Sequence, residues 1–180
     1  GYENIPVIAL SAQGIETNPG FTVSPKLAYK LGYGLIYGDL IMRLSNATRP
    51  YELEKGSTDK LKDKWIETCK NHVVSPNISG FKKNVDDMIK DFENLPVDEE
   101  KIVPKVGIVG EILVKYLPEA NNNLQKILES EGTEVVMPDL TDFIMYCLRN
   151  ATHKNELLSK GKFMRYLSNL GVKYIEFFRD

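Results

Sequence analysis

Short apolar runs and a stretch of helical periodicity alternate in the second half of the chain. Residues 105–110 are a short continuous apolar run, which is typical of a parallel strand buried on both faces, and residues 133–138 are predicted to form a second strand. Between them, apolar side chains at helical spacing predict a helix from about Asn121 to Gly132. The inward face of this helix is expected to carry Leu124, Ile127 and Leu128. The order predicts a β-α-β unit with two parallel strands and a right-handed crossover.

The first half of the chain is predicted to open with a short buried strand at residues 5–10 and to continue as helices. Ser24 is a suitable N-cap and Pro25 a suitable first helical residue for the first of them. This helix should end before Arg49, because the residue that precedes a proline disfavours the α conformation. Its apolar stripe is expected to be Leu27, Leu31, Leu35, Ile41 and Leu44. Its glycines are expected to serve close packing or a kink, and they are Gly32, Gly34 and Gly38.

Four further stretches show helical spacing of apolar residues. Helices are predicted at residues 57–71, 79–94 and 139–150. Residues 155–180 are expected to be helical with a break near Gly171.

These elements together predict an α/β fold, in which a Rossmann-like parallel sheet is layered with helices and carries a helical insertion. Residues 1–95 form an N-terminal strand plus a helical segment, and residues 96–104 form a charged, proline-flanked connector. Residues 105–180 form a Rossmann-like β-α-β-α segment with C-terminal helices. Because a strand begins the chain with no helix before it, we expect an incomplete domain of a larger protein.

Composition and charge narrow the classes of function. The 23 basic and 25 acidic residues give a net charge of −2 without a basic stripe, so no nucleic-acid partner is expected. Neither a signal peptide nor an apolar run long enough to cross a membrane is present, so we expect a cytoplasmic protein with no membrane contact.

The two cysteines and two histidines are isolated from one another along the chain. Cys69 and Cys147 each continue an apolar helical stripe, which is typical of buried thiols in a reducing compartment. His72 and His153 do not complete a recognisable ligand spacing with them, so no metal site is expected in this segment.

In an open parallel sheet, ligands bind beyond the carboxyl ends of the strands. Glu111 directly follows the first apolar run and is either a ligand-facing carboxylate or a partner for a nearby amide. Asn121, Asn122 and Asn123 stand at the start of the next helix, where they either cap it or help to receive an anion. Asp139 follows the second run and is a further ligand-facing candidate.

Two candidates lie in the first half of the chain. Asn18 belongs to a loop with turn chemistry beside the first predicted strand. The guanidinium of Arg49 either holds a phosphate or carboxylate, or pairs with Glu52 or Asp39 to lock the end of a helix. Because no established nucleophile, metal-protease or phosphate-loop motif occurs, the sequence identifies no catalytic residue.

Several segments resemble one protein family. Residues 105–124 (KVGIVGEILVKYLPEANNNL) and 129–140 (ESEGTEVVMPDL) resemble the 2-hydroxyacyl-CoA dehydratase component family, in particular proteins described as acyl-CoA dehydratase activase-related or CoA-substrate-specific enzyme activase-related. Residues 5–8, 37–43 and 49–52 resemble the same proteins less closely.

The resemblance implies an anaerobic system in which an actin-like ATPase, the activase, passes an electron to a dehydratase with [4Fe–4S] clusters. The reduced enzyme then removes water from an acyl-CoA through a ketyl radical. Neither Cys69 nor Cys147 matches a cluster ligand of that family, so no cofactor is expected in this segment. The cluster and ATP would belong to the full-length protein, and other domains of that protein, the activase among them, would be the partners.

Two classes of function stay open. This segment either belongs to such a dehydratase or activator system without being catalytic alone, or it is a non-catalytic α/β module that binds a ligand or scaffolds neighbouring domains. A small-molecule-binding domain unrelated to CoA is a third alternative.

Overall fold

The computed structural model describes residues 24–157, two short strands before them, and the separate helical positions 166, 169–173 and 176. The two strands, β1 (Leu10–Ser11) and β2 (Gly14–Ile15), pair with each other in antiparallel orientation. The rest of the strand predicted at residues 5–10, and the loop candidate Asn18, lie outside the described residues.

The longest helix, α1 (Pro25–Thr48), begins and ends where the sequence predicted. The Ser24 hydroxyl accepts a hydrogen bond from the Leu27 amide at 3.1 Å, so the expected cap is confirmed. After Thr48 the chain turns through the 3-10 helix η1 (Arg49–Tyr51), because Pro50 cannot continue the hydrogen bonding of an α-helix.

The buried face of α1 differs from the predicted stripe. Tyr33, Tyr37 and Ile41 are buried, whereas Leu31 is half exposed. The aromatic rings of Tyr33 and Tyr37 pack against Phe81, at 5.1 Å between ring centroids in each case. A helix that is apolar on several sides turns toward its partners the face that gives the best packing, and here the aromatic contacts decide it.

The glycines of α1 do not serve close packing where the structure describes their surroundings. A Cβ atom added at Gly34 or Gly38 would meet nothing within 4 Å, so the expected tight approach is wrong at both positions.

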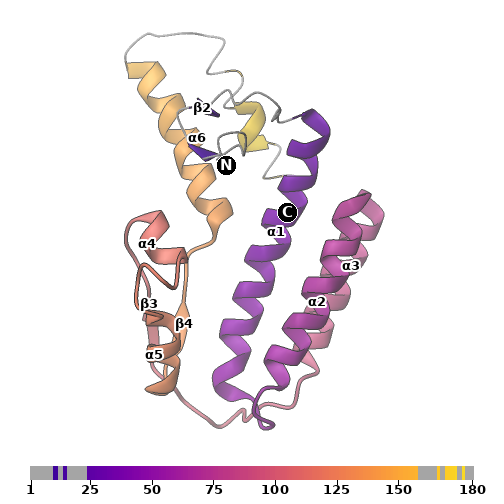
Figure 1. The fold of residues 1–180 in the computed structure, drawn as a ribbon, viewed down its shortest axis with the longest axis vertical. Helices are drawn as coiled ribbons and strands as arrows, with labels where there is room; N and C mark the ends of the chain where they lie inside the picture. Colours follow the sequence, from indigo (N-terminus) through magenta and orange to yellow (C-terminus); the bar gives the residue numbers. More distant parts are fainter. Residues whose placement is uncertain are drawn as a thin grey trace, which may run out of the picture.

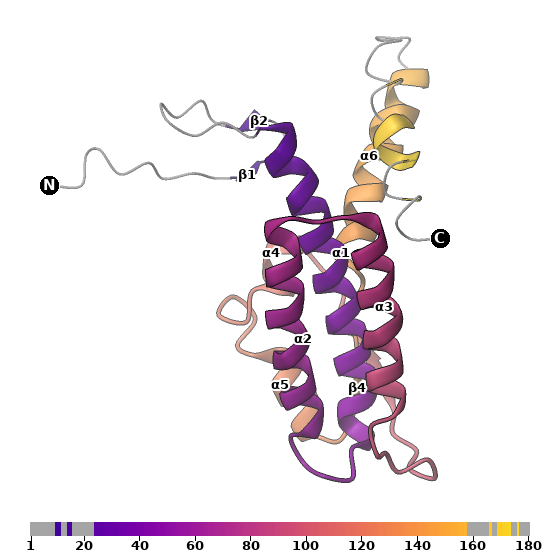
Figure 2. The ribbon, with the colours of Figure 1, turned by 90° about the vertical axis from the view of Figure 1, so that its right-hand side faces the viewer.

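Two helices pack beside α1 and form a three-helix bundle with it (Figure 2). They are α2 (Ser57–Val74) and α3 (Ile78–Glu93), both close to the predicted ranges. The bundle core is made of aromatic, aliphatic and sulfur side chains from all three helices, namely Tyr33, Tyr37, Ile41, Trp65, Cys69, Phe81, Met88 and Phe92.

The β-α-β unit lies on the other side of α1 from α2 and α3 (Figure 1). Strands β3 (Lys105–Gly107) and β4 (Glu134–Val136) are parallel, with Val106 opposite Val135, so the predicted pairing of these two runs is confirmed. Helix α5 (Leu124–Ser130) connects them, and the chain leaves it through Gly132, whose φ of 82° favours glycine.

Two details of this unit depart from the sequence prediction. The segment after β3 is not all loop, because it contains the short helix α4 (Ile112–Tyr116). On α5, Leu128 packs against the second core, but Ile127 is half exposed and Leu124 is 37% exposed. This core consists of Ile108, Val135 and Met137, with Met42 of α1 packed against it.

Helix α6 (Leu140–Leu157) follows β4 and is attached to α1 by a buried carboxylate. Asp39 accepts hydrogen bonds from the backbone amides of Leu140 at 2.9 Å and Thr141 at 2.8 Å. Its charge therefore lies at the N-terminus of α6, where the helix dipole favours an anion.

The described part of the chain is mostly helical, with one two-stranded parallel sheet, which agrees with an α/β class in the coarse sense. Residues 169–173 are helical, so the chain has no break at Gly171 itself. Among the described helices, none has the length and apolarity needed to cross a membrane.

Candidate functional site

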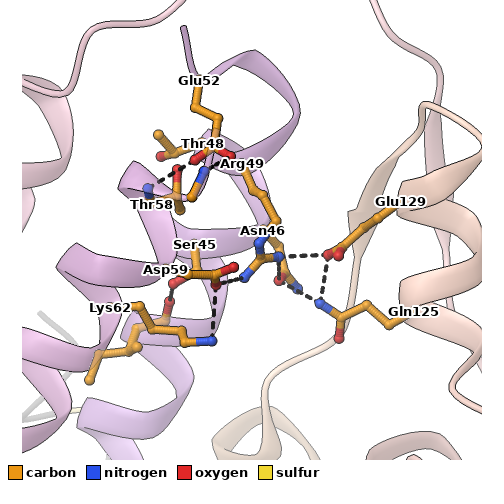
Figure 3. Close-up of polar contacts among 12 residues, drawn as sticks. Ser45, Asn46, Thr48, Arg49, Glu52, Thr58, Asp59, Lys62, Gln125 and Glu129 are labelled. Carbon is orange, nitrogen blue, oxygen red and sulfur yellow. Dashed lines mark hydrogen bonds and ion pairs between the residues drawn. The ribbon is translucent and has the colours of Figure 1, made fainter. Parts of the chain in front are cut away.

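Arg49 joins the helical bundle to the β-α-β unit (Figure 3). Its guanidinium donates to Asp59 of α2 at 3.0 Å and to Glu129 of α5 at 2.6 Å. The Gln125 amide extends the network, because it donates to Glu129 at 2.8 Å and to Asn46 at 2.9 Å. The planar fork of an arginine suits two carboxylates approaching from different sides.

The sequence left two alternatives for Arg49, a ligand contact or an ion pair that locks a helix end. These contacts agree with the ion pair, but the partners are Asp59 and Glu129 and not Glu52 or Asp39. Glu52 instead accepts hydrogen bonds from the amides of Gly56 at 2.7 Å and Thr58 at 2.9 Å, at the start of α2. Burial alone would raise the pKa of Glu52, but these hydrogen bonds outweigh it and lower the pKa below its ordinary value. Asp39 is occupied by α6.

A cleft of about 430 Å³ opens next to this network, between α1 and α2 on one side and α4 and α5 on the other. Met137 contributes to its wall directly after the end of β4, and Lys115 and Tyr116 contribute from α4, which follows β3. The cleft thus lies by the carboxyl ends of the parallel strands, where ligands bind in open sheets. Its volume falls in the range of small-molecule sites.

The cleft combines positive charge with apolar surface. Four basic and two acidic side chains line it, which leaves two positive charges uncompensated. The acidic ones, Asp59 and Glu129, are the two that pair with Arg49. The apolar part of the lining comes from Met42, Tyr116, Pro118 and Met137.

Lys115 differs from the other basic groups of the cleft. Only 9% of the residue is exposed. Its ammonium nitrogen lies 4.8 Å from the centre of the Tyr116 ring, and within the described residues no carboxylate pairs with it. The Tyr116 hydroxyl in turn donates to the Pro138 carbonyl, and burial raises the pKa of this tyrosine to about 12, which keeps it neutral.

The three asparagines have separate roles. Asn121 accepts from the Leu124 amide at 3.1 Å, and its side-chain amide donates to the carbonyls of Val114 at 2.9 Å and Lys115 at 3.2 Å. Asn121 therefore holds the turn before α5 and the end of α4, whereas Asn123, the N-cap residue of α5, makes no side-chain capping hydrogen bond. Asn122 and Asn123 have φ of 55° and 56°, a left-handed conformation that asparagine tolerates. Asn121 and Asn123 line the cleft together with Arg49.

Glu111 and Asp139 lie elsewhere. Glu111 caps α4 by accepting from the Val114 amide at 3.1 Å, so of its two alternatives the amide partner agrees with the structure. Asp139 pairs with Arg43 at 3.3 Å and lines a separate cavity of about 250 Å³ between α1, α3 and α6. The sequence-predicted candidates therefore do not all meet in one place.

The cysteines and histidines form no metal site in the part of the chain that the structure describes. Burial raises the pKa of the Cys69 thiol to about 12, so this thiol stays protonated. His72 lies in the bundle, where its Nδ1 is 3.1 Å from the Tyr37 hydroxyl.

Sequence reasoning missed the lysines of the cleft. Lys115 interrupts an apolar run, Ile112 to Leu117, and such an interruption was the available signal. Lys62 and Lys126 give no such signal, since both lie on ordinary polar helix faces and reach the cleft only through the packing of α2 and α5.

Comparison of this chain with protein-family models, with curated proteins and with solved structures found no match.

Proposed function

We propose that this chain is the ligand-binding module of an anaerobic 2-hydroxyacyl-CoA dehydratase-like or activase-related system, and that it holds a CoA thioester without being catalytic alone. The observation that carries the proposal is the cleft beside β4, which offers uncompensated positive charge next to an apolar wall. A CoA thioester has the matching character, because it joins phosphates to a long, weakly polar arm. The resemblance of residues 105–140 to that family supports the same ligand.

We also propose that strands beyond β3 and β4 complete a Rossmann-like layered sheet. Within the described residues each of these strands pairs only with the other, so each keeps one edge that another strand can extend. Further strands, the actin-like activase, the [4Fe–4S] cluster and ATP would belong to other parts of the full-length protein. The free thiols of Cys69 and Cys147 favour a reducing compartment, and we propose the cytoplasm.

A domain-scaffolding role is the second candidate, and one observation favours it. Val109, Leu113 and Val114 expose apolar side chains near one another in sequence, in the loop after β3 and on α4. Exposed apolar groups that gather on one surface commonly mark a protein contact.

Calorimetric titration with butyryl-CoA tests the proposed ligand. We expect saturable binding, and clearly weaker binding of the butyryl thioester of N-acetylcysteamine, which lacks the nucleotide. Absence of saturable heat with butyryl-CoA would contradict the proposed function and leave the scaffolding role. In a dehydration assay with a 2-hydroxyacyl-CoA, the 180-residue protein alone should show no turnover, and measurable turnover would contradict the non-catalytic part of the proposal.

A further inference from the structure

The ammonium of Lys115 has no carboxylate partner within the described residues, although most of the residue is buried. The residue is 91% buried, but its aliphatic stem accounts for most of this burial, and the ammonium nitrogen keeps contact with the solvent of the cleft. In the described part of the chain, the Tyr116 ring is the only interaction of its ammonium. A cation–π contact of this kind does not neutralise the positive charge, which stays available to an anion.

The neighbouring carboxylates cannot take the place of a partner. Asp59 and Glu129 are the acidic groups of the cleft, and each is held by Arg49, at 3.0 Å and 2.6 Å. Asp59 also accepts from Lys62 at 3.1 Å. Lys115 and Lys126 are therefore the two basic groups of the cleft whose charge no carboxylate balances within the described residues.

The position of Lys115 is fixed by its surroundings. Its backbone amide donates to the Glu111 carbonyl at 2.9 Å, and its own carbonyl accepts from the Asn121 side chain at 3.2 Å. The Tyr116 ring beside it is held through its hydroxyl by the Pro138 carbonyl. A cation whose backbone and neighbour are both held is pre-organised for a ligand, which reduces the entropy lost on binding.

We infer that Lys115 is the central cation of a phosphate-binding subsite in this cleft, with Lys126 as a second, exposed cation at the rim. A phosphate monoester carries a charge of about −1.5 to −2 at pH 7, which balances the two uncompensated lysines. Lysine binds phosphate as a compact point charge, while the arginine of the cleft is already occupied by carboxylates. This inference rests on the proposed function, because it assigns the phosphate-binding part of the same cleft.

Calorimetric titration with pyrophosphate tests the subsite, with acetate as a carboxylate probe. Wild-type protein should bind pyrophosphate saturably and acetate more weakly, and K115M should lower the pyrophosphate affinity at least about tenfold, as expected for a lost hydrogen bond to a charged group. K82M makes the same change at an exposed position on α3, away from the cleft, and should leave the affinity unchanged. Equal affinity of K115M and wild type, or no binding by wild type, would overturn the inference.

Thermal unfolding separates a binding role from a structural one. Without ligand, K115M should melt at the same or a higher temperature than wild type, because methionine keeps an apolar stem of similar length and removes a charge that no carboxylate balances. Pyrophosphate should raise the melting temperature of wild type but not of K115M. A lower melting temperature of K115M together with an undiminished response to pyrophosphate would assign Lys115 to packing and reject the subsite.

A titration of the wild-type protein alone does not depend on the folding of a variant. In ¹H–¹⁵N spectra, pyrophosphate should shift the amide signals of Lys115, Tyr116 and Lys126 more than those of α3. Shifts confined to other residues would contradict the inference.

The same samples distinguish this inference from the proposed function. If pyrophosphate binding depends on Lys115 but butyryl-CoA neither binds nor competes, the subsite stands and the CoA proposal fails. If butyryl-CoA binds K115M as well as wild type, the CoA proposal stands and the subsite fails.

Discussion

The helical bundle and the β-α-β unit share α1, but Tyr37 in the bundle and Lys115 in the β-α-β unit differ in the partners of their polar atoms. In the bundle, the buried Tyr37 hydroxyl has two partners, His72 at 3.1 Å and Asn84 at 3.1 Å. In the β-α-β unit, the buried Lys115 has a charge that no carboxylate balances within the described residues. The β-α-β unit therefore contains the unbalanced charge on which the proposed phosphate subsite depends.

The two regions also differ in how much apolar surface they bury. The bundle core joins eight buried residues from three helices, whereas the core of the β-α-β unit has three. We therefore expect the bundle to contribute most of the stability, and three changes test this difference, from the largest expected effect to the smallest.

Phe81→Ala should have the largest effect, because Phe81 is buried against Tyr33 and Tyr37 in the bundle core. A buried phenylalanine replaced by alanine leaves a cavity and costs about 3–5 kcal/mol of the free energy of unfolding. Urea denaturation followed by circular dichroism measures this loss. Ile127→Ala on the half-exposed face of α5 is the matched control, and an equal loss there would contradict the proposed division between the regions.

Asp39→Asn should have an intermediate effect, because it weakens the attachment of α6 to α1. Loss of the charged acceptor for the amides of Leu140 and Thr141 should cost about 1.5–3 kcal/mol. In D39N, amide hydrogen exchange should become faster than in wild type in the first turn of α6, and more so there than in α2. Asp63→Asn makes the same change at an exposed position of α2 and should leave the free energy of unfolding and the exchange rates unchanged. Equal exchange in wild type and D39N would mean that packing alone holds α6.

Glu52→Gln should have the smallest effect, and this effect should appear as a change in how the free energy of unfolding depends on pH. Its pKa in the folded protein is lowered, so its contribution is fully present above its ordinary pKa of 4.5 and is lost as the pH falls through the folded pKa. Denaturation curves below pH 4.5 should show wild type losing stability more steeply than E52Q. At pH 7, E52Q should be less stable by about 1 kcal/mol, the typical contribution of a helix-capping carboxylate. E99Q at an exposed position controls for the change in charge, and parallel pH curves for wild type and E52Q would contradict the role.

The local elements followed from the sequence to a large extent. The Ser24 cap, the stop at Pro50, the glycine exit at Gly132 and the two parallel strands all depend on interactions within a few residues or on continuous apolar runs. These features are encoded where they occur, which is why the pattern of residues predicted them.

The buried faces and the candidate site could not be predicted in the same way. Helix α1 is apolar on more than one side, and only its aromatic contacts with α3 selected Tyr33 and Tyr37 over Leu31. Arg49 has acidic residues nearer in sequence, but it pairs with Glu129, which is 80 residues away.

By itself, the sequence determined the longer helices, both ends of α1 and the parallel pair of strands, because capping, proline geometry and periodicity act over short distances. Only the tertiary structure decided that Arg49 links two regions, that Asp39 holds α6, and that Lys115 lies buried without a carboxylate beside a cleft. The physical reason is that burial and charge pairing depend on which distant segments meet in space. The spacing of residues along the chain does not contain that information.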